Sequence, residues 1–381
     1  MDRYDVAVIG SGIVGLFISY MLGNLHHDGR LRARVLCIDK ECAVALHASG
    51  RNSGVIHSGI HAKPGTLKAR FCVKGNRMMY QLLDRLSIPY RRSGMLILCT
   101  NDGGAGALEE LQRRGHANGV DGVRVVQGDE VGRIERYARG DLGLWVGSAG
   151  VTDATMLAYT LYERARASGV EFMLNSTVTG IDEVVDGYRV EMVNSRQRES
   201  RRTVHARLIV NSAGVHADDI ANMVGLRRYR IYPCIGEYYL VRRKPHLVNS
   251  LIYPIPTFDH RGLGIHLTKR LDGTIAIGPN AIYVESKDEE SDGVKGRLNR
   301  SMDEFYSSAA NMVDGINRED LEYGYYGIRA RLAGYGSSEE PDFVVEEHPS
   351  NLIHLIGIES PGFTASPAIA EHVIGMIGDR L

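Results

Sequence analysis

The N-terminal pattern of hydrophobic and polar positions is that of a strand, a tight turn and a buried helix. Residues 6–9 are apolar and rich in β-branched side chains, and residues 13–22 are apolar on all sides. Such runs are typical of a buried parallel strand and of a helix inside a domain. A second apolar run, 34–39, follows a polar turn at 26–29. This order predicts a βαβ unit with a right-handed crossover, so a parallel sheet begins near the N-terminus.

The rest of the chain mixes strand and helix periodicities. Between residues 230 and 281, aromatic and β-branched side chains alternate with Pro and Gly turns, which predicts an antiparallel sheet with one face toward a cavity. The charged runs 196–202 and 285–292 are interpreted as a solvated hairpin and a solvated loop. Other patterns predict strands at 95–98, 171–174, 178–183, 188–193, 208–210 and 352–356, and helices at 106–119, between a cap at 152–153 and Gly169, and at about 367–379.

The order of these elements predicts an α/β fold, α+β overall, with two domains. At 381 residues the chain is long enough for two or three structural units. A Rossmann-like domain is expected to be assembled from three separate segments, 1–88, 147–220 and 322–381. An antiparallel β-rich domain, made of 89–146 and 221–321, is then inserted in two pieces.

Composition narrows the choice of partners. The 45 Lys and Arg nearly balance the 46 Asp and Glu, so there is no overall basic field to hold nucleic acid. Five cysteines are scattered without a C-x-x-C pair, which argues against a zinc site and a disulfide framework and predicts no bound metal. Residues 6–27 carry no formal charge, but an acidic start and three glycines argue against a signal peptide or membrane span. A cytoplasmic location is the simplest expectation.

A glycine-rich turn joins the first strand to the first helix. It reads Gly10-Ser-Gly12-Ile13-Val14-Gly15, the G-x-G-x-x-G pattern in which backbone N–H groups and a helix N-terminus hold a pyrophosphate. Asp39, followed by Lys40, ends the next strand 24 positions after Gly15, near the usual interval for a carboxylate that binds ribose hydroxyls. The motif predicts dinucleotide binding, the alternative being a turn that only allows close packing. NAD and FAD share this motif, so the glycines do not choose between them.

Six further stretches carry a resemblance to a known family. They are 50–60 (GRNSGVIHSGI), 63–69 (KPGTLKA), 236–238 (GEY), 263–268 (LGIHLT), 278–281 (GPNA) and 360–367 (SPGFTASP). Together they resemble FAD-dependent L-2-hydroxyglutarate dehydrogenases and oxidases, which belong to the wider D-amino-acid-oxidase and glycerol-3-phosphate-dehydrogenase superfamily. The resemblance covers nearly the whole chain.

This resemblance implies an FAD-binding domain of the D-amino-acid-oxidase type and the oxidation of a small anionic 2-hydroxy acid. The first expectation for the substrate is L-2-hydroxyglutarate, oxidised to 2-oxoglutarate by hydride transfer to flavin N5. A glycerol-3-phosphate dehydrogenase or oxidase is the main alternative, and an amino-acid or amine oxidase is a further one. A dinucleotide-binding protein without turnover is the alternative from a different class.

Two residues carry the expected chemistry. His57 lies in the first of the six stretches, and an imidazole with an ordinary pKa of about 6.5 takes a hydroxyl proton near neutral pH. A hydrogen-bonded core histidine or a flavin tether is the alternative. Arg329 falls where the superfamily places a guanidinium that holds the substrate carboxylate or phosphate, and Arg331 is expected on the same strand face. Structural ion pairing is the alternative for Arg329.

The resemblance also implies a substrate pocket. His266 and Thr268 alternate with apolar residues, so both side chains point to one face of a strand. With Tyr238 and Glu237 they resemble the family's pocket, although ordinary packing inside a sheet is the alternative. His61 stands where hydroxyglutarate enzymes carry Tyr and glycerol-phosphate relatives often carry Arg. It would add positive charge for a second carboxylate or for a phosphate.

The remaining FAD contacts implied by the resemblance lie in four segments. The segment 360–364 precedes a helix and aims backbone N–H groups at the reduced flavin. No cysteine follows Cys234, so non-covalent FAD is expected. The electron acceptor (oxygen, quinone or a carrier), peripheral membrane contact and oligomeric state leave no readable signature. The residues implied are Arg51, Asn52 and Ser53 along the flavin and its phosphates, Val178 near adenine, Ala213 and Gly214 in a second loop beside the dinucleotide, and Ser360, Pro361, Gly362, Phe363 and Thr364 at the helix.

Overall fold

The N-terminal segments β1 (Asp2–Ile9), α1 (Ile13–His27) and β2 (Val35–Ile38) form the predicted βαβ unit. The computed structural model describes residues 1–27, 29, 33–100, 104–197, 200–256, 263–337 and 339–381. β1 pairs in parallel with β2 and with β12 (Arg201–Asn211). The turn between β1 and α1 is tight, because a Cβ on Gly15 would lie only 1.9 Å from the carbonyl oxygen of Gly10. Glycine is therefore required there.

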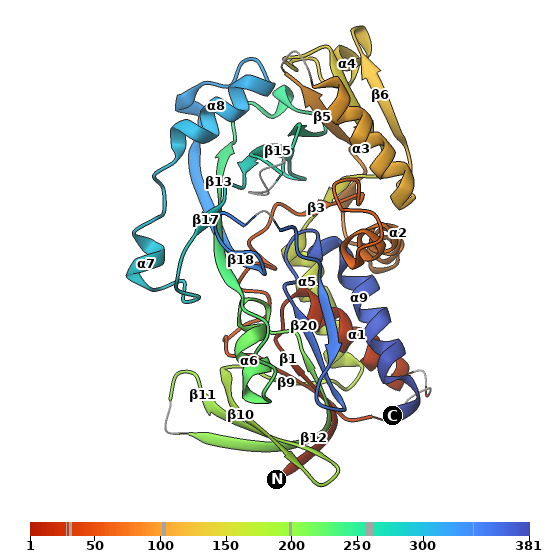
Figure 1. Cartoon of the computed structure of the whole chain (residues 1–381), viewed down its shortest axis with the longest axis vertical. Helices are drawn as coiled ribbons and strands as arrows, with labels where there is room; N and C mark the ends of the chain where they lie inside the picture. Colours follow the sequence, from red (N-terminus) through yellow and green to blue (C-terminus); the bar gives the residue numbers. More distant parts are fainter. Residues whose placement is uncertain (28, 30–32, 101–103, 198–199, 257–262, 338) are drawn as a thin grey trace.

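The first sheet is built around this unit (Figure 1). Its strand order is β10-β11-β12-β1-β2-β9, with β20 parallel to the C-terminal end of β12 and β19 antiparallel to β20. Four helices contribute apolar side chains to the core beside this sheet. The strands are β9 (Glu171–Met173), β10 (Ser176–Val184), β11 (Gly187–Asn194), β19 (Val344–Glu347) and β20 (Leu352–Ile356), and the helices are α1, α2 (Leu67–Leu86), α5 (Ala154–Ala167) and α9 (Gly362–Ile377).

The second sheet lies at the other end of the molecule from the two termini (Figure 1). Its order is β17-β13-β16-β15-β14-β5-β7-β6, and β18 pairs with β13. The predicted antiparallel sheet is confirmed from β13 to β16, whereas β14 pairs in parallel with β5. The strands are β5 (Met95–Cys99), β6 (Val123–Gln127), β7 (Leu142–Val146), β13 (Tyr232–Val241), β14 (Leu251–Pro254), β15 (His266–Lys269), β16 (Ile275–Gly278), β17 (Ile282–Tyr283) and β18 (Glu322–Arg331).

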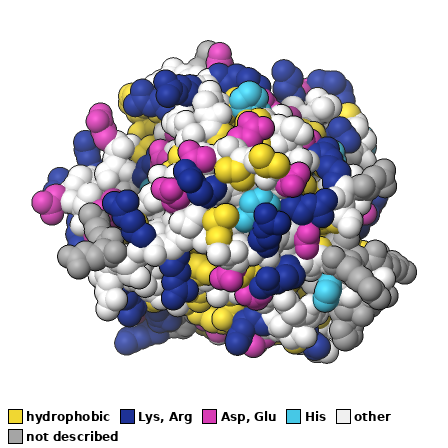
Figure 2. All heavy atoms as spheres, turned by 90° about the horizontal axis from the view of Figure 1, so that it is seen from below, with side chains coloured by type: hydrophobic (Ala, Val, Ile, Leu, Met, Phe, Trp, Pro, Cys, Tyr) yellow, Lys and Arg dark blue, Asp and Glu magenta, His cyan; other side chains and the backbone are white. Residues whose placement is uncertain are grey.

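Shorter elements complete the fold. A small antiparallel sheet, β3-β8-β4, lies between the two larger ones, and the predicted domain boundary at 322 falls at the start of β18. Figure 2 shows basic and acidic side chains intermingled on the face seen from below. The remaining elements are β3 (Val55–Ile56), β4 (Tyr90–Arg91), β8 (Gly150–Thr152), α3 (Ala105–Asn118), α4 (Asp129–Ile134), α6 (Ala217–Met223), α7 (Asp292–Lys295), α8 (Met302–Met312) and the 3₁₀ turns Gly214–His216, Pro245–Leu247, Arg318–Asp320 and Gly378–Arg380.

The C-terminal helix begins earlier than predicted. The sequence pattern placed its start at Pro367, but α9 begins at Gly362 and contains that proline. A proline inside a helix leaves the carbonyl four residues before it without its usual N–H donor. Here the Ser366 hydroxyl donates to the Phe363 carbonyl at 2.7 Å and supplies the missing hydrogen bond. The first turn of α9 therefore contains residues that were expected in a loop.

The prediction of a solvated loop at 285–292 is wrong at Glu289. This carboxylate is only 7% exposed and lies 2.8 Å from His47 Nδ1 and 2.5 Å from Arg51 Nη1. The partners are more than 230 positions away in the chain, so the charge pattern of the loop alone does not reveal them. The hairpin at 196–202 is confirmed by the antiparallel pairing of β11 with β12, although residues 198 and 199 lie outside the described chain.

Candidate active site

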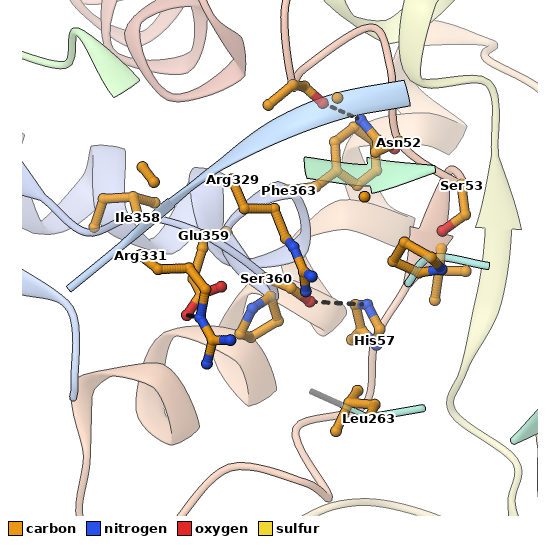
Figure 3. Close-up of a pocket in the computed structure, with 18 of the residues that line it drawn as sticks. Asn52, Ser53, His57, Leu263, Arg329, Arg331, Ile358, Glu359, Ser360 and Phe363 are labelled. Atoms are coloured by element: carbon orange, nitrogen blue, oxygen red, sulfur yellow. Dashed lines mark hydrogen bonds and ion pairs between the residues drawn. The ribbon is translucent and has the colours of Figure 1, made fainter. Parts of the chain in front are cut away.

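A cavity of about 700 Å³ joins the glycine-rich turn to residues of the second sheet. Its lining includes Gly12, Ile13 and Val14 at one end and Tyr238 and His266 at the other. The site therefore draws on segments that are distant in sequence but adjacent in the fold. Figure 3 shows part of this lining around His57 and Arg329.

The glycine-rich end of the cavity suits a dinucleotide. The Ile13 N–H at the start of α1 donates to Ser49 Oγ at 2.8 Å, and a Cβ on Gly12 would lie 3.1 Å from the same hydroxyl. Asp39 ends β2 beside the turn and accepts hydrogen bonds from the Ser11 N–H and hydroxyl at 2.6 and 2.7 Å. Each carboxylate oxygen has a second lone pair, so Asp39 retains capacity to accept from a ribose. Asp39 and Lys40 border the turn but do not line the cavity itself.

The segment that follows β2 is held by its own hydrogen bonds. Asn52 Nδ2 donates to the Ser49 carbonyl at 2.7 Å, and Asn52 Oδ1 accepts from the Gly54 N–H at 2.8 Å. Arg51 lines the cavity, but its guanidinium is paired with Glu289. Ser53 also lines the cavity. The segment thus presents small polar groups, with the Arg51 charge already balanced inside the protein.

The other predicted cofactor residues divide into two groups. Gly214 and residues 360–363 line the cavity. Ala213 lies next to the lining residue Ser212, whereas Val178 is buried in the core of the first sheet and does not line the cavity. Thr364 is fully buried, and its hydroxyl oxygen accepts a hydrogen bond from the His57 N–H. The helix N-terminus that was predicted to face the flavin is in the cavity wall.

His57 is held in place through its backbone from two helices. Its N–H donates to Thr364 Oγ1 of α9 at 2.9 Å, and its carbonyl accepts from Asn76 Nδ2 of α2 at 2.9 Å. Its ring faces the cavity, where Nε2 lies 3.4 Å from the Ser360 hydroxyl (Figure 3). Burial lowers the pKa of His57 from 6.5 to about 4. The imidazole is therefore neutral at physiological pH and able to accept a proton.

A cluster of aromatic rings that the sequence analysis did not find surrounds this histidine. Tyr253 of β14 stacks on His266 at a centroid distance of 3.9 Å and on His61 at 5.7 Å, and it meets His57 edge-on at 6.5 Å. Burial lowers the pKa of both His61 and His266 to about 3. His61 is therefore neutral at physiological pH. The prediction that His61 adds positive charge at this position is wrong. No local pattern marks Tyr253, because its role arises from the pairing of β14 with β15.

Arg329 of β18 reaches the same part of the cavity. Its Nη2 donates to the Asn280 carbonyl at 2.9 Å, and its Nε has no hydrogen-bond partner among the described residues. Figure 3 shows the guanidinium pointing toward Ser360 and His57. Within the described chain, no carboxylate lies within ion-pair distance of it. An anionic ligand would satisfy both its charge and its free donors.

Arg331, two positions further along β18, has a different environment. Its Nε lies 3.6 Å from Glu359 Oε1, and its guanidinium stands over the Tyr283 ring at 5.6 Å. Lys68 of α2 lies 3.4 Å from the same carboxylate oxygen of Glu359. Arg331 and Lys68 are thus both close to a carboxylate of the protein. Lys68 lies in the stretch 63–69 that carries the family resemblance, but neither Lys68 nor Glu359 was predicted as a site residue.

The strand residues predicted for the pocket are only partly brought together. Tyr238 lines the cavity and stacks on Tyr325 at 4.8 Å, and the Tyr325 hydroxyl donates to the Asn52 carbonyl. Thr268 is buried and lies outside the lining. Glu237 is fully buried, accepts hydrogen bonds from Asn280 Nδ2 and the Asn299 N–H, and also lies outside the lining. The arrangement of Glu237 is structural.

Comparison with known proteins identifies the family. The sequence profile of the DAO family, described as FAD dependent oxidoreductase, matches residues 5–376. The chain belongs to the FAD dependent oxidoreductase family. Mitochondrial L-2-hydroxyglutarate dehydrogenase of Arabidopsis thaliana is 33% identical to this oxidoreductase, over 98% of this chain and 83% of that protein. L-2-hydroxyglutarate dehydrogenase of Escherichia coli K12 is 28% identical, over 98% and 93%.

Solved structures confirm the fold of this FAD-dependent oxidoreductase. L-alpha-glycerophosphate oxidase from Mycoplasma pneumoniae with FAD bound has a TM-score of 0.86 at 24% identity, covering 99% of this chain and 95% of that one. Glycine oxidase from Geobacillus kaustophilus has a TM-score of 0.79 at 21% identity, with the same coverage. FAD is the cofactor, as predicted. In the part of the chain that the structure describes, no helix combines the length and apolar character needed to cross a bilayer.

The low pKa of His57 predicts the pH dependence of this FAD-dependent oxidoreductase. A histidine that acts as a base works in its neutral form, and burial lowers the His57 pKa to about 4, so the His57 imidazole is neutral throughout the neutral range. We expect the rate constant of flavin reduction at saturating substrate to be constant from about pH 6 to 8 and to fall only as the pH approaches 4. Stopped-flow measurement after a rapid pH jump tests this. A midpoint near pH 6.5 would show that His57 is solvated or not the base.

Proposed function

We propose that this oxidoreductase converts L-2-hydroxyglutarate to 2-oxoglutarate. The observation that carries the substrate is the similarity, over nearly the full length, to proteins named L-2-hydroxyglutarate dehydrogenase from a plant, an ape and a bacterium. The cavity supports it, because a neutral imidazole and a guanidinium without a carboxylate partner face the same space. These are the two groups that oxidation of a 2-hydroxy acid requires.

The proposed roles follow from the positions of the side chains. Arg329 binds the C1 carboxylate and thereby orients C2. His57 Nε2 accepts the proton of the C2 hydroxyl as the C–O single bond becomes a carbonyl, and Ser360 lies close enough to hold the ring or the hydroxyl. Bound FAD would supply the hydride acceptor for this oxidation at C2. The substrate loses one hydride and one proton in total, which balances the oxidation of an alcohol to a ketone.

The glycine-rich turn, Asp39 and the start of α9 would hold the dinucleotide. We propose that residues 1–88, 147–220 and 322–381 form the FAD-binding domain and that the rest of the chain covers the substrate. We also propose non-covalent FAD, because Cys234 is buried in β13 and no cysteine follows it. The scattered, unpaired cysteines favour a cytoplasmic location.

Anaerobic mixing with three candidate substrates tests the proposal. The purified yellow protein is mixed in turn with L-2-hydroxyglutarate, its D enantiomer and glycerol 3-phosphate, and the flavin absorption is followed. We expect bleaching by the L acid alone, because Arg329 and His57 fix which face of C2 is presented. Bleaching by glycerol 3-phosphate alone would replace the proposed substrate with the phosphate ester. If none of the three compounds bleaches the flavin, the family membership stands, but the proposed substrate is wrong.

A further inference from the structure

The cationic side chains in the cavity wall differ in whether a carboxylate of the protein lies close to them. Among the described residues, five line the cavity: Arg51, Lys68, Arg114, Arg329 and Arg331. Arg51 is paired with Glu289, and Lys68 and Arg331 share Glu359. Arg114 has only Glu110, at 3.8 Å, and that carboxylate is bound more closely by Arg113 at 2.5 Å. Arg114 and Arg329 are thus the two cavity cations without a close carboxylate of their own.

Arg114 projects from α3, a helix that holds none of the residues predicted for the site. Its side chain is 19% exposed, and its Nη1 donates to the His61 carbonyl at 3.0 Å. Its Nε is buried and has no hydrogen-bond partner in the described chain. A guanidinium has five N–H donors, so several remain for a ligand. The carboxylate or phosphate of a ligand is the group that this planar fork fits best.

The bond from Arg114 to His61 is not what holds the loop 59–62. Asn118, one turn further along α3, donates from Nδ2 to the Gly59 carbonyl at 3.0 Å and to the Ala62 carbonyl at 2.8 Å. These two bonds fix the loop independently. The loop does not need the hydrogen bond from Arg114, so a structural role in this loop does not explain why the charge of Arg114 is buried.

Arg114 and Arg329 are near different histidines of the ring cluster around Tyr253, because Arg114 Nη1 donates to the His61 carbonyl. The charge of Arg114 acts on His61, and the charge of Arg329 acts on His266, while both rings stack on Tyr253. The proposed substrate has the matching pattern, because its two carboxylates are separated by three carbons with the reacting C2 next to one of them. With C1 at Arg329 and C2 at His57, the far carboxylate would require a second cation in the same cavity, and Arg114 is a lining cation without a close carboxylate.

We propose that Arg114 binds the C5 carboxylate of the substrate and makes the site select a 2-hydroxy dicarboxylate over a 2-hydroxy monocarboxylate. This inference rests on the function proposed above and adds the residue that would determine specificity. The neutral ring of His61 forms part of the wall beside it, and the uncommitted donors of the guanidinium supply the charge-assisted hydrogen bonds.

The test compares two substrates of equal carbon number. For Arg114→Gln, we expect kcat/KM for L-2-hydroxyglutarate to fall roughly 10- to 100-fold, mainly through KM, as loss of a charge-assisted hydrogen bond predicts. For L-2-hydroxyvalerate, which lacks the C5 carboxylate, kcat/KM should change less than about threefold. Arg166→Gln is the control of matched chemistry, because that side chain is 54% exposed on α5, pairs with Glu163 and does not line the cavity, and it should leave kcat/KM for both substrates unchanged. Calorimetric titration of the FAD-loaded protein with glutarate and with butyrate gives a readout independent of turnover, and only glutarate should bind more weakly.

The outcomes separate this inference from the proposed function. Equal losses on both substrates in Arg114→Gln would show a structural role and overturn it, and Asn118→Ala shows what such a loss looks like. If Arg114→Gln does not fold, Arg114→Lys replaces it, and a loss confined to the dicarboxylate is again expected. Failure of the wild-type protein to be reduced by L-2-hydroxyglutarate overturns the proposed substrate and this inference together. Reduction of the wild type with an unchanged dicarboxylate preference in the variants overturns this inference alone.

Discussion

Flavin reduction by L-2-hydroxyglutarate should slow at least about a hundredfold in His57→Ala, the lower range for loss of a general base. FAD should stay bound, because the substitution changes neither the glycine-rich turn, which lies at the other end of the cavity, nor Asp39 beside that turn. The backbone of residue 57 should also stay in place, since Thr364 and Asn76 hold its N–H and carbonyl rather than its ring. The loss is thus expected in the chemical step. Anaerobic stopped-flow reduction at saturating substrate measures it directly.

Two controls make the His57 result specific. The ratio of FAD to protein, from the absorption spectrum, shows whether the variant is loaded. His116→Ala removes an exposed histidine of α3 and should be reduced at the wild-type rate. Wild-type reduction of a fully loaded His57→Ala would remove His57 from the mechanism, and His266 would become the next imidazole to test.

Most of the fold could be predicted from the sequence because its signals lie between residues that are close together in the chain. The β1-turn-α1 unit was predictable because G-x-G-x-x-G lies between a β-branched run and an apolar run, and each feature requires only neighbours in the chain. The cap of α5 was equally local, since Asp153 accepts from the Met156 N–H three residues later. The start of α9 was missed because Pro367 usually marks a boundary, and the compensating Ser366 hydroxyl is a detail of side-chain geometry.

The candidate site was predictable only where a family pattern supplied it. His57 and Arg329 came from the resemblance, and the structure brings both to one cavity. Glu289, Tyr253 and Arg114 were missed because their roles depend on contacts between residues that are 53 to 242 positions apart in the chain. The helix α2 was also missed, although its Thr66 cap is a local signal that would have placed Lys68 and Asn76 on it.

Replacement of Arg329 by Gln should lower kcat/KM for L-2-hydroxyglutarate roughly 100- to 1,000-fold, the range for truncating one partner of a buried charge pair. The C1 carboxylate would lose its planar fork of donors, so both binding and the orientation of C2 would suffer. Arg331→Gln should cost much less, because Glu359 and the Tyr283 ring already engage that guanidinium. Steady-state kinetics of both variants decides between the two arginines. A larger loss of kcat/KM in Arg331→Gln would show that Arg331, and not Arg329, binds the C1 carboxylate.

The same substitution should act in the opposite direction on stability. Arg329 is enclosed in the cavity wall, and no carboxylate of the described chain lies within ion-pair distance of it. The cost of desolvating its charge is offset only at longer range, by the Glu359 carboxylate. Arg329→Gln should therefore leave the melting temperature of the FAD-loaded protein without substrate unchanged or higher. Addition of 2-oxoglutarate should raise the melting temperature of the wild type but not of the variant, because ligand binding to the folded state is lost. Substantial destabilisation of the unliganded variant would instead make Arg329 a structural residue, and the substrate carboxylate would then need another partner in the cavity.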